Sequence, residues 1–129
     1  MKKKNNEVVI NGITYVPKGE EMAKPNTEGM EYRIIRSYSA GVFAGYVKHR
    51  EGKEVELVNA RRIWYWDGAN SLSDLATIGV TKPENCKFCT PINVIITEAI
   101  EIIEVTEKAK KCIESVKEWT LKDDDGDDE

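Results

Sequence analysis

Residues 54–66 read Glu-Val-Glu-Leu-Val-Asn-Ala-Arg-Arg-Ile-Trp-Tyr-Trp, two short runs of strand-forming residues separated by Asn59 and Ala60. Side chains alternate along a strand, so the two arginines fall on opposite faces, each with at least one aromatic ring: Arg61 shares its face with Ile63 and Tyr65, and Arg62 with Trp64 and Trp66. We expect one of these faces to fill the core.

The pattern continues on both sides of this segment. Two further strands are expected before it, at residues 32–38 and 42–48, with polar turns at 40–41 and 50–53. After it, Ser71 begins a short helix over residues 71–76, and an irregular stretch lies between Pro83 and Pro91. Residues 92–97 and 99–105 are rich in isoleucine and valine and are expected to be extended, although a helix over the second run remains an alternative. A C-terminal helix is expected at 106–118. The fold class is therefore α+β: a small antiparallel β-meander body with a short central helix and a C-terminal helix.

The chain divides into three parts by composition. Residues 7–17 place Asn11-Gly12 between β-branched runs, which is typical of a hairpin, and residues 18–30 are polar and resemble a linker. The body is expected to span residues 31–120 as one ligand-binding domain. Residues 121–129 are expected to form a disordered acidic tail.

Charge is unevenly distributed. The net charge is −4, but the tail holds six of the 23 acidic residues, and the remaining 17 face 19 lysines and arginines. A nearly neutral body does not resemble a nonspecific DNA-binding protein, which normally has a clearly basic surface. The nearly neutral charge of the body is more consistent with a protein that binds a small anionic ligand in one pocket.

No apolar run is long enough to span a membrane, and no signal-peptide core follows the first residues, so we expect a soluble cytosolic protein.

Cys86 and Cys89 have the spacing of a metal or redox pair, but a zinc site needs four ligands, and Cys112 and His49 would complete a set only by a coincidence of fold. Buried, reduced cysteine is the favoured interpretation, and no metal or cofactor is expected. His49 has no obvious nucleophile beside it, so we expect binding rather than catalysis.

Residue types point to a nucleotide. The guanidinium groups of Arg61 and Arg62 match phosphate oxygens, and nearby rings can stack on a base. The small residues of 38–45, with the hydroxyls of Ser37 and Ser39, can approach an anion, and so can the helix start at Ser71. Each feature also has a purely structural interpretation. The arginine–aromatic segment can be a core strand, residues 38–45 can form a tight turn, and Ser71 can cap a helix. Phe88 is interpreted equally well as an exposed stacking ring or as a core residue.

Four motifs resemble one family: Tyr-Ser-Ala-Gly-Val-Phe-Ala-Gly at 38–45, Asn-Ala-Arg-Arg-Ile-Trp-Tyr-Trp-Asp-Gly-Ala at 59–69, Ser-Leu-Ser at 71–73 and Cys-Lys-Phe at 86–88. Over residues 31–119 the chain resembles the first Thoeris anti-defence family of phage and prophage proteins. The resemblance implies a sponge in the host cytoplasm that sequesters the cyclic ADP-ribose isomer made by bacterial TIR proteins, without cleaving it. It also implies homo-oligomers built from dimers and, in some members, uptake of cyclic oligonucleotides.

For such a ligand, we expect a site drawn from eight residues, in which arginines meet the diphosphate, rings stack on adenine and hydroxyls reach the riboses: Arg36, Tyr38, Ser39, Arg61, Arg62, Tyr65, Phe88 and Thr90. Two alternatives stay open. One is a module that binds single-stranded nucleic acid or cyclic oligonucleotides on the Trp64–Trp66 strand. The other is an acidic-tail mimic of DNA that blocks a host enzyme.

Overall fold

The structure is a computed structural model that describes residues 8–10, 13–15 and 21–121. Its central element is an antiparallel meander of three strands, β3 (Glu31–Ser37), β4 (Gly41–Glu51) and β5 (Glu54–Tyr65). The expected meander is confirmed, and the two runs expected on either side of Asn59 and Ala60 form one continuous strand that ends at Tyr65.

A bend in the middle of β5 allows this continuity. Asn59 has a φ of 51°, in the left-handed region, and the pairing register between β4 and β5 shifts nearby, between Ala44 and Tyr46. Gly45 sits at this shift, where a Cβ atom would come within 2.6 Å of Ala60. The absence of a side chain at Gly45 thus lets the two strands cross closely where β5 bends.

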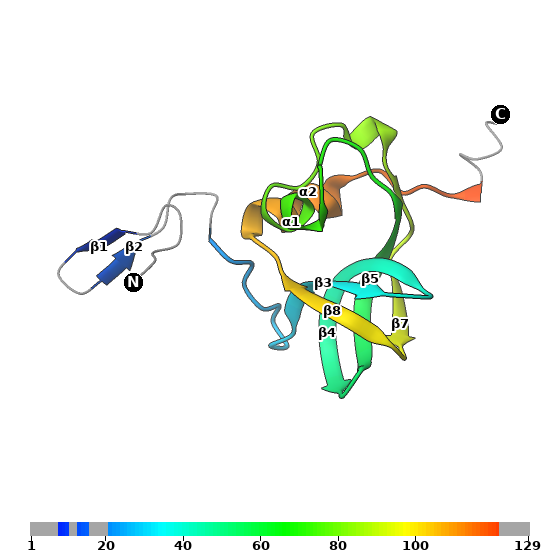
Figure 1. The fold of residues 1–129 in the computed structure, drawn as a ribbon, viewed down its shortest axis with the longest axis horizontal. Helices are drawn as coiled ribbons and strands as arrows, with labels where there is room; N and C mark the ends of the chain where they lie inside the picture. The colour runs from blue at the N-terminus through cyan, green and yellow to red at the C-terminus, as the bar shows by residue number, and fades with distance from the viewer. Residues whose placement is uncertain (1–7, 11–12, 16–20, 122–129) are drawn as a thin grey trace.

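Three more strands extend the sheet to six. β6 (Lys87–Phe88) and β7 (Ile92–Ile96) both pair with β5, and β8 (Ala99–Glu104) pairs with β3 at the opposite edge. Only Thr97 and Glu98 connect β7 to β8, so the two edges must lie close together and the sheet is rolled (Figure 1). One face of the rolled sheet buries a first apolar cluster, formed by Ile35, Phe43, Val55, Leu57, Ala60 and Ile96.

The other face of the sheet packs against two α-helices, α1 (Leu72–Thr77) and α2 (Glu107–Ser115), which lie next to each other (Figure 1). Both begin at side-chain caps, because Ser71 Oγ accepts from the backbone N–H of Asp74 and Thr106 Oγ1 accepts from that of Ala109. The second apolar cluster fills this interface, with Tyr32, Ile34, Ile63, Leu75, Phe88 and Ile113 among its members. The α+β architecture with a short central helix and a C-terminal helix is thus observed.

The C-terminal helix is shorter than expected. α2 ends at Ser115 instead of residue 118, and the chain continues extended, with Glu118 bridging to Phe88 in parallel. In the expected irregular stretch, a 3₁₀ turn, η1 (Pro83–Asn85), precedes β6. The segment after α2 therefore lies beside β6 at the end of the sheet.

The N-terminal part agrees partly with expectation. β1 (Val8–Ile10) and β2 (Ile13–Tyr15) pair as a hairpin, whose turn lies outside the described residues, as does the tail from residue 122. Within the expected linker, the N–H of Ala23 bonds to the carbonyl of Val105 at 2.9 Å, and Ala23 is buried. The body therefore begins before residue 31.

No helix in the described ranges is long and apolar enough to cross a membrane.

Candidate functional site

Three of the eight expected site residues meet at one groove. It lies between the turn that joins β3 to β4 and the last residues of β5, and its volume is about 390 Å³. Tyr38, Ser39 and Arg62 line it, together with Trp64 and Trp66, and we call it the turn–strand groove. This volume falls within the range of small-molecule sites.

The groove presents aromatic surface to solvent. The side chain of Tyr38, at the tip of the turn, is 88% exposed, and that of Trp64 is 65% exposed. Large aromatic side chains are seldom left this open unless they contact something else. The alternative interpretation of this segment as a core strand therefore does not apply to Trp64, whereas Trp66 is half-buried against the second cluster.

Arg62 supplies the cation of the groove. Its guanidinium carbon lies 4.5 Å from the centre of the Phe43 ring, a cation–π contact that leaves the N–H groups at the guanidinium edge. Among the described residues, Arg62 forms no side-chain hydrogen bond and no ion pair. An anion that enters the groove thus meets a positioned arginine that no carboxylate of the described residues neutralises.

Arg61 has a different role from the expected one. It is only 3% exposed, and its guanidinium donates to four backbone carbonyls, those of Phe88, Cys89, Ile113 and Val116, at 2.7–2.9 Å. Burial lowers the pKa of Arg61. The expected diphosphate contact does not fit this placement, because the side chain already holds β6 and the end of α2 against β5.

Phe88 is also buried, inside the second cluster, with the Arg61 guanidinium 5.6 Å from its ring centre. Of the two interpretations of Phe88, an exposed stacking ring or a core residue, the structure agrees with the core residue. Its ring is therefore not available to stack on a base. The backbone of Phe88 has a separate task, since its carbonyl accepts from the N–H of Trp119 at 2.9 Å.

A stacked pair of indoles flanks the groove. The ring centres of Trp64 and Trp119 are 6.4 Å apart at an angle of 14°, and Lys87 Nζ lies 5.1 Å from the Trp119 ring centre. The sequence reasoning missed Trp119 as a site residue. Its position just before the acidic tail gave no signal, since the contact depends on the early end of α2.

The remaining expected site residues lie apart from the groove. Arg36 is exposed and ion-paired with Glu101 on β8 at 2.8 Å. Thr90 Oγ1 donates to a Glu118 carboxylate oxygen at 3.0 Å. Tyr65 is exposed at the end of β5, but does not line the groove. The structure thus brings Tyr38, Ser39 and Arg62 together and leaves these three outside.

All three cysteines are half-buried, not buried as expected, and Cys86 and Cys112 accept backbone hydrogen bonds in the described part of the chain. The Sγ atoms of Cys86 and Cys112 accept from the backbone N–H groups of Asp67 and Val80, and burial raises the pKa of the Cys86 thiol. No group of three metal-ligating side chains gathers within the described residues. At α1, Ser71 acts as a cap, as in the structural interpretation of the helix start.

A family model for a domain of unknown function, DUF6948, matches residues 30–113. The chain belongs to this family. The match covers β3 through most of α2 and so includes both sides of the turn–strand groove. No curated protein and no solved structure matches the chain.

Proposed function

We propose that the protein binds a signalling nucleotide of the cyclic ADP-ribose type in the turn–strand groove and holds it without cleaving it. The observation that carries this proposal is the guanidinium of Arg62, which no described carboxylate pairs with, in a groove that two exposed rings, Tyr38 and Trp64, also line. A nucleotide offers the matching groups, because its phosphates accept charge-assisted hydrogen bonds and its base stacks on aromatic faces.

The resemblance to the first Thoeris anti-defence family gives this binding a purpose. A phage protein that sequesters the TIR-produced cyclic ADP-ribose isomer in the host cytoplasm keeps the effector of the defence system inactive. Such a sponge needs tight, stoichiometric binding. We propose homo-oligomers as well, and the exposed isoleucines of β7 and β8, Ile92, Ile95 and Ile100, support association through these strands.

The decisive experiment is uptake followed by release. The purified protein is incubated with cyclic ADP-ribose isomers and separated from free ligand, and the bound fraction is heat-denatured and analysed by mass spectrometry. We expect one isomer to be recovered intact. A cleaved product would mean catalysis, and no uptake of any isomer would refute the proposal.

Variants test the groove itself. Arg62→Ala is expected to weaken binding by about 1.5–3 kcal/mol, the typical loss when a hydrogen bond to a charged group is removed. Arg50→Ala is the matched control, because Arg50 is an exposed arginine at the β4–β5 turn that does not line the groove. Equal affinities of the two variants, measured by calorimetry, would move the site elsewhere.

A second candidate function rests on the stacked indoles. Trp64, Trp119 and Lys87 form a cation-flanked aromatic platform of the kind that binds single-stranded nucleic acid. The salt dependence of the affinity distinguishes the two functions. Binding of single-stranded nucleic acid through many phosphates weakens steeply as the salt concentration rises, whereas binding of one diphosphate in a groove is less sensitive.

A further inference from the structure

A second hollow lies on the helix side of the sheet, between β3–β5 and the end of α2. Its volume is about 560 Å³, and it is lined in part by Tyr32, Tyr46, Asn59, Glu114 and Glu118. We call it the helix–sheet pocket. It shares no lining residue with the turn–strand groove. Its size suits a small molecule.

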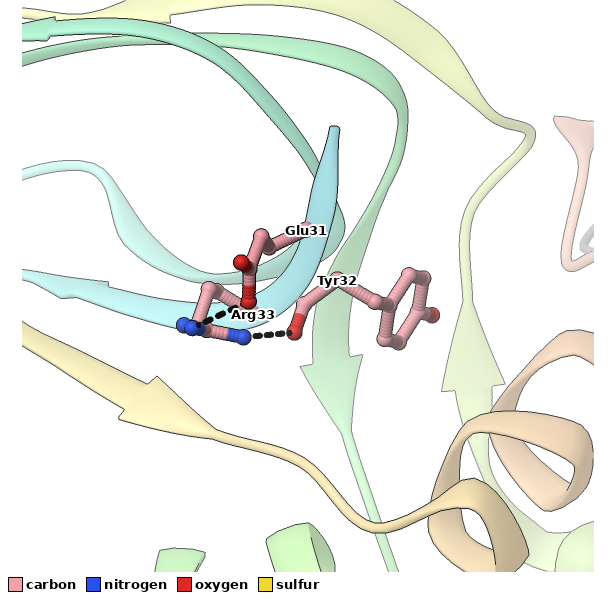
Figure 2. A network of polar contacts seen from close by, with 3 residues as sticks. All are labelled: Glu31, Tyr32 and Arg33. Atoms are coloured by element: carbon pink, nitrogen blue, oxygen red, sulfur yellow. Dashed lines mark hydrogen bonds and ion pairs between the residues drawn. The ribbon is translucent and has the colours of Figure 1, made fainter. Parts of the chain in front are cut away.

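One lining residue of the helix–sheet pocket, Tyr32, has a buried hydroxyl for which the described residues supply no hydrogen-bond partner. Tyr32 is only 1% exposed, and its ring stands edge-on to that of Tyr46, with 5.1 Å between centres. Figure 2 shows its side chain directed away from Glu31 and Arg33, which bond to each other. Among the described residues, none forms a hydrogen bond with the Tyr32 hydroxyl. Buried polar groups nearly always have a partner, so this hydroxyl points to a polar guest.

The hydroxyl keeps its proton. Burial raises the pKa of Tyr32, and the nearby Glu114 carboxylate raises it further. Tyr32 can therefore donate one hydrogen bond and accept another at neutral pH. A guest group that both donates and accepts, such as a hydroxyl, uses this capacity fully.

The rim adds an acceptor and an amide. The Glu114 carboxylate has no hydrogen bond or ion pair within the described residues, and neither has the side-chain amide of Asn59. The lining residues carry two carboxylates, Glu114 and Glu118, and two cations, Arg61 and Lys117. These charges balance, which favours a neutral guest over an ion.

We propose that the helix–sheet pocket binds a neutral sugar ring through two adjacent hydroxyl groups. A vicinal diol donates to the Glu114 carboxylate, as riboses do to acidic residues elsewhere, and accepts from Tyr32 and the Asn59 amide. Two sources offer this chemistry, the ribose of a nucleoside and a free sugar. The pocket and the groove are separate, so this inference does not depend on the proposed function.

The test is a titration followed by amide chemical shifts of the ¹⁵N-labelled full chain. Three probes are used: methyl β-D-ribofuranoside, adenosine and 2′-deoxyadenosine, which lacks the diol. We expect shifts at residues 59–61 and 114–118 with the first two probes, and at least tenfold weaker binding of the third. Preference for adenosine over the riboside identifies a nucleoside, and equal binding identifies a free sugar. Absence of these shifts, or equal binding of adenosine and 2′-deoxyadenosine, overturns the proposal.

Two variants assign the contacts. Tyr32→Phe is expected to weaken binding at least tenfold without lowering the melting temperature, because it removes a hydroxyl that no described residue pairs with. Glu114→Gln changes an exposed residue and is expected to weaken binding with the fold intact. Arg50→Ala, at an exposed residue that lines neither hollow, is expected to leave these shifts unchanged. Unchanged binding in Tyr32→Phe or Glu114→Gln, or a clearly lower melting temperature of Tyr32→Phe, contradicts the proposal.

Discussion

Arg61 and Arg62 are neighbours in the chain, and their guanidinium groups have opposite surroundings. Arg61 satisfies four carbonyls inside the protein, whereas Arg62 lies over Phe43 at the wall of the turn–strand groove. Strand alternation correctly places the two on opposite faces. It does not identify the structural one, because the acceptors of Arg61 lie 27–55 residues further along the chain.

The two arginines therefore differ in their effect on stability. Arg61→Met leaves four carbonyls without their donor and is expected to lower the free energy of unfolding by about 3–5 kcal/mol. That loss is a large part of the roughly 5–15 kcal/mol that stabilises a typical domain. Arg62→Met is the matched control and is expected to cost less than about 1 kcal/mol. Urea denaturation measures both, and similar losses would contradict the assigned roles.

At the scale of elements, the strands and caps were predictable and the segment after α2 was not. Alternating apolar residues and turn glycines indicate β3, β4 and β5, and Ser71 and Thr106 mark the helix starts. Helical spacing also favours residues 116–118 as helix. In the structure, however, α2 ends at Ser115, where Arg61 donates hydrogen bonds to the carbonyls of Ile113 and Val116. Such distant partners override local periodicity.

The extended segment positions Trp119 over Trp64, and this contact has a spectroscopic signature. Two stacked indoles couple excitonically in the far ultraviolet, so Trp119→Ala is expected to abolish that circular dichroism couplet. The variant is also expected to lose about 0.5–1.5 kcal/mol of stability, typical of an aromatic pair. Leu121→Ala is the control, since Leu121 is an exposed apolar neighbour. A couplet that persists in Trp119→Ala would disprove the stacking.

At the scale of the whole molecule, charge and binding surface are separated along the chain. The acidic residues of 123–129 lie outside the family match, whereas the turn–strand groove lies inside it and the helix–sheet pocket combines β3–β5 with residues 114–118 just beyond its end. Composition indicates this division, because the body is nearly neutral once the tail is set aside. It does not predict the two hollows, which depend on how the sheet rolls.

Deleting residues 122–129 tests whether the tail takes part in function. We expect uptake of cyclic ADP-ribose isomers to be unchanged, because every residue assigned to the groove lies in the body. Under the proposed function, inhibition of the Thoeris defence in infected cells is likewise expected to persist. If the shortened protein keeps its fold but loses inhibition, the acidic-tail mimic becomes the better explanation.

The rolled sheet also constrains the order in which the protein can fold during synthesis. β3 closes against β8 through contacts such as Arg36–Glu101, which are 65 residues apart, and Arg61 finds its last acceptor only at Val116. Because distant strand pairs close slowly, the meander can form early on the ribosome, but the roll cannot close until residues beyond 100 have left the exit tunnel. The helix–sheet pocket, which Glu114 and Glu118 help to line, therefore exists only after those residues have emerged, whereas the turn–strand groove needs only residues 38–66 of the meander.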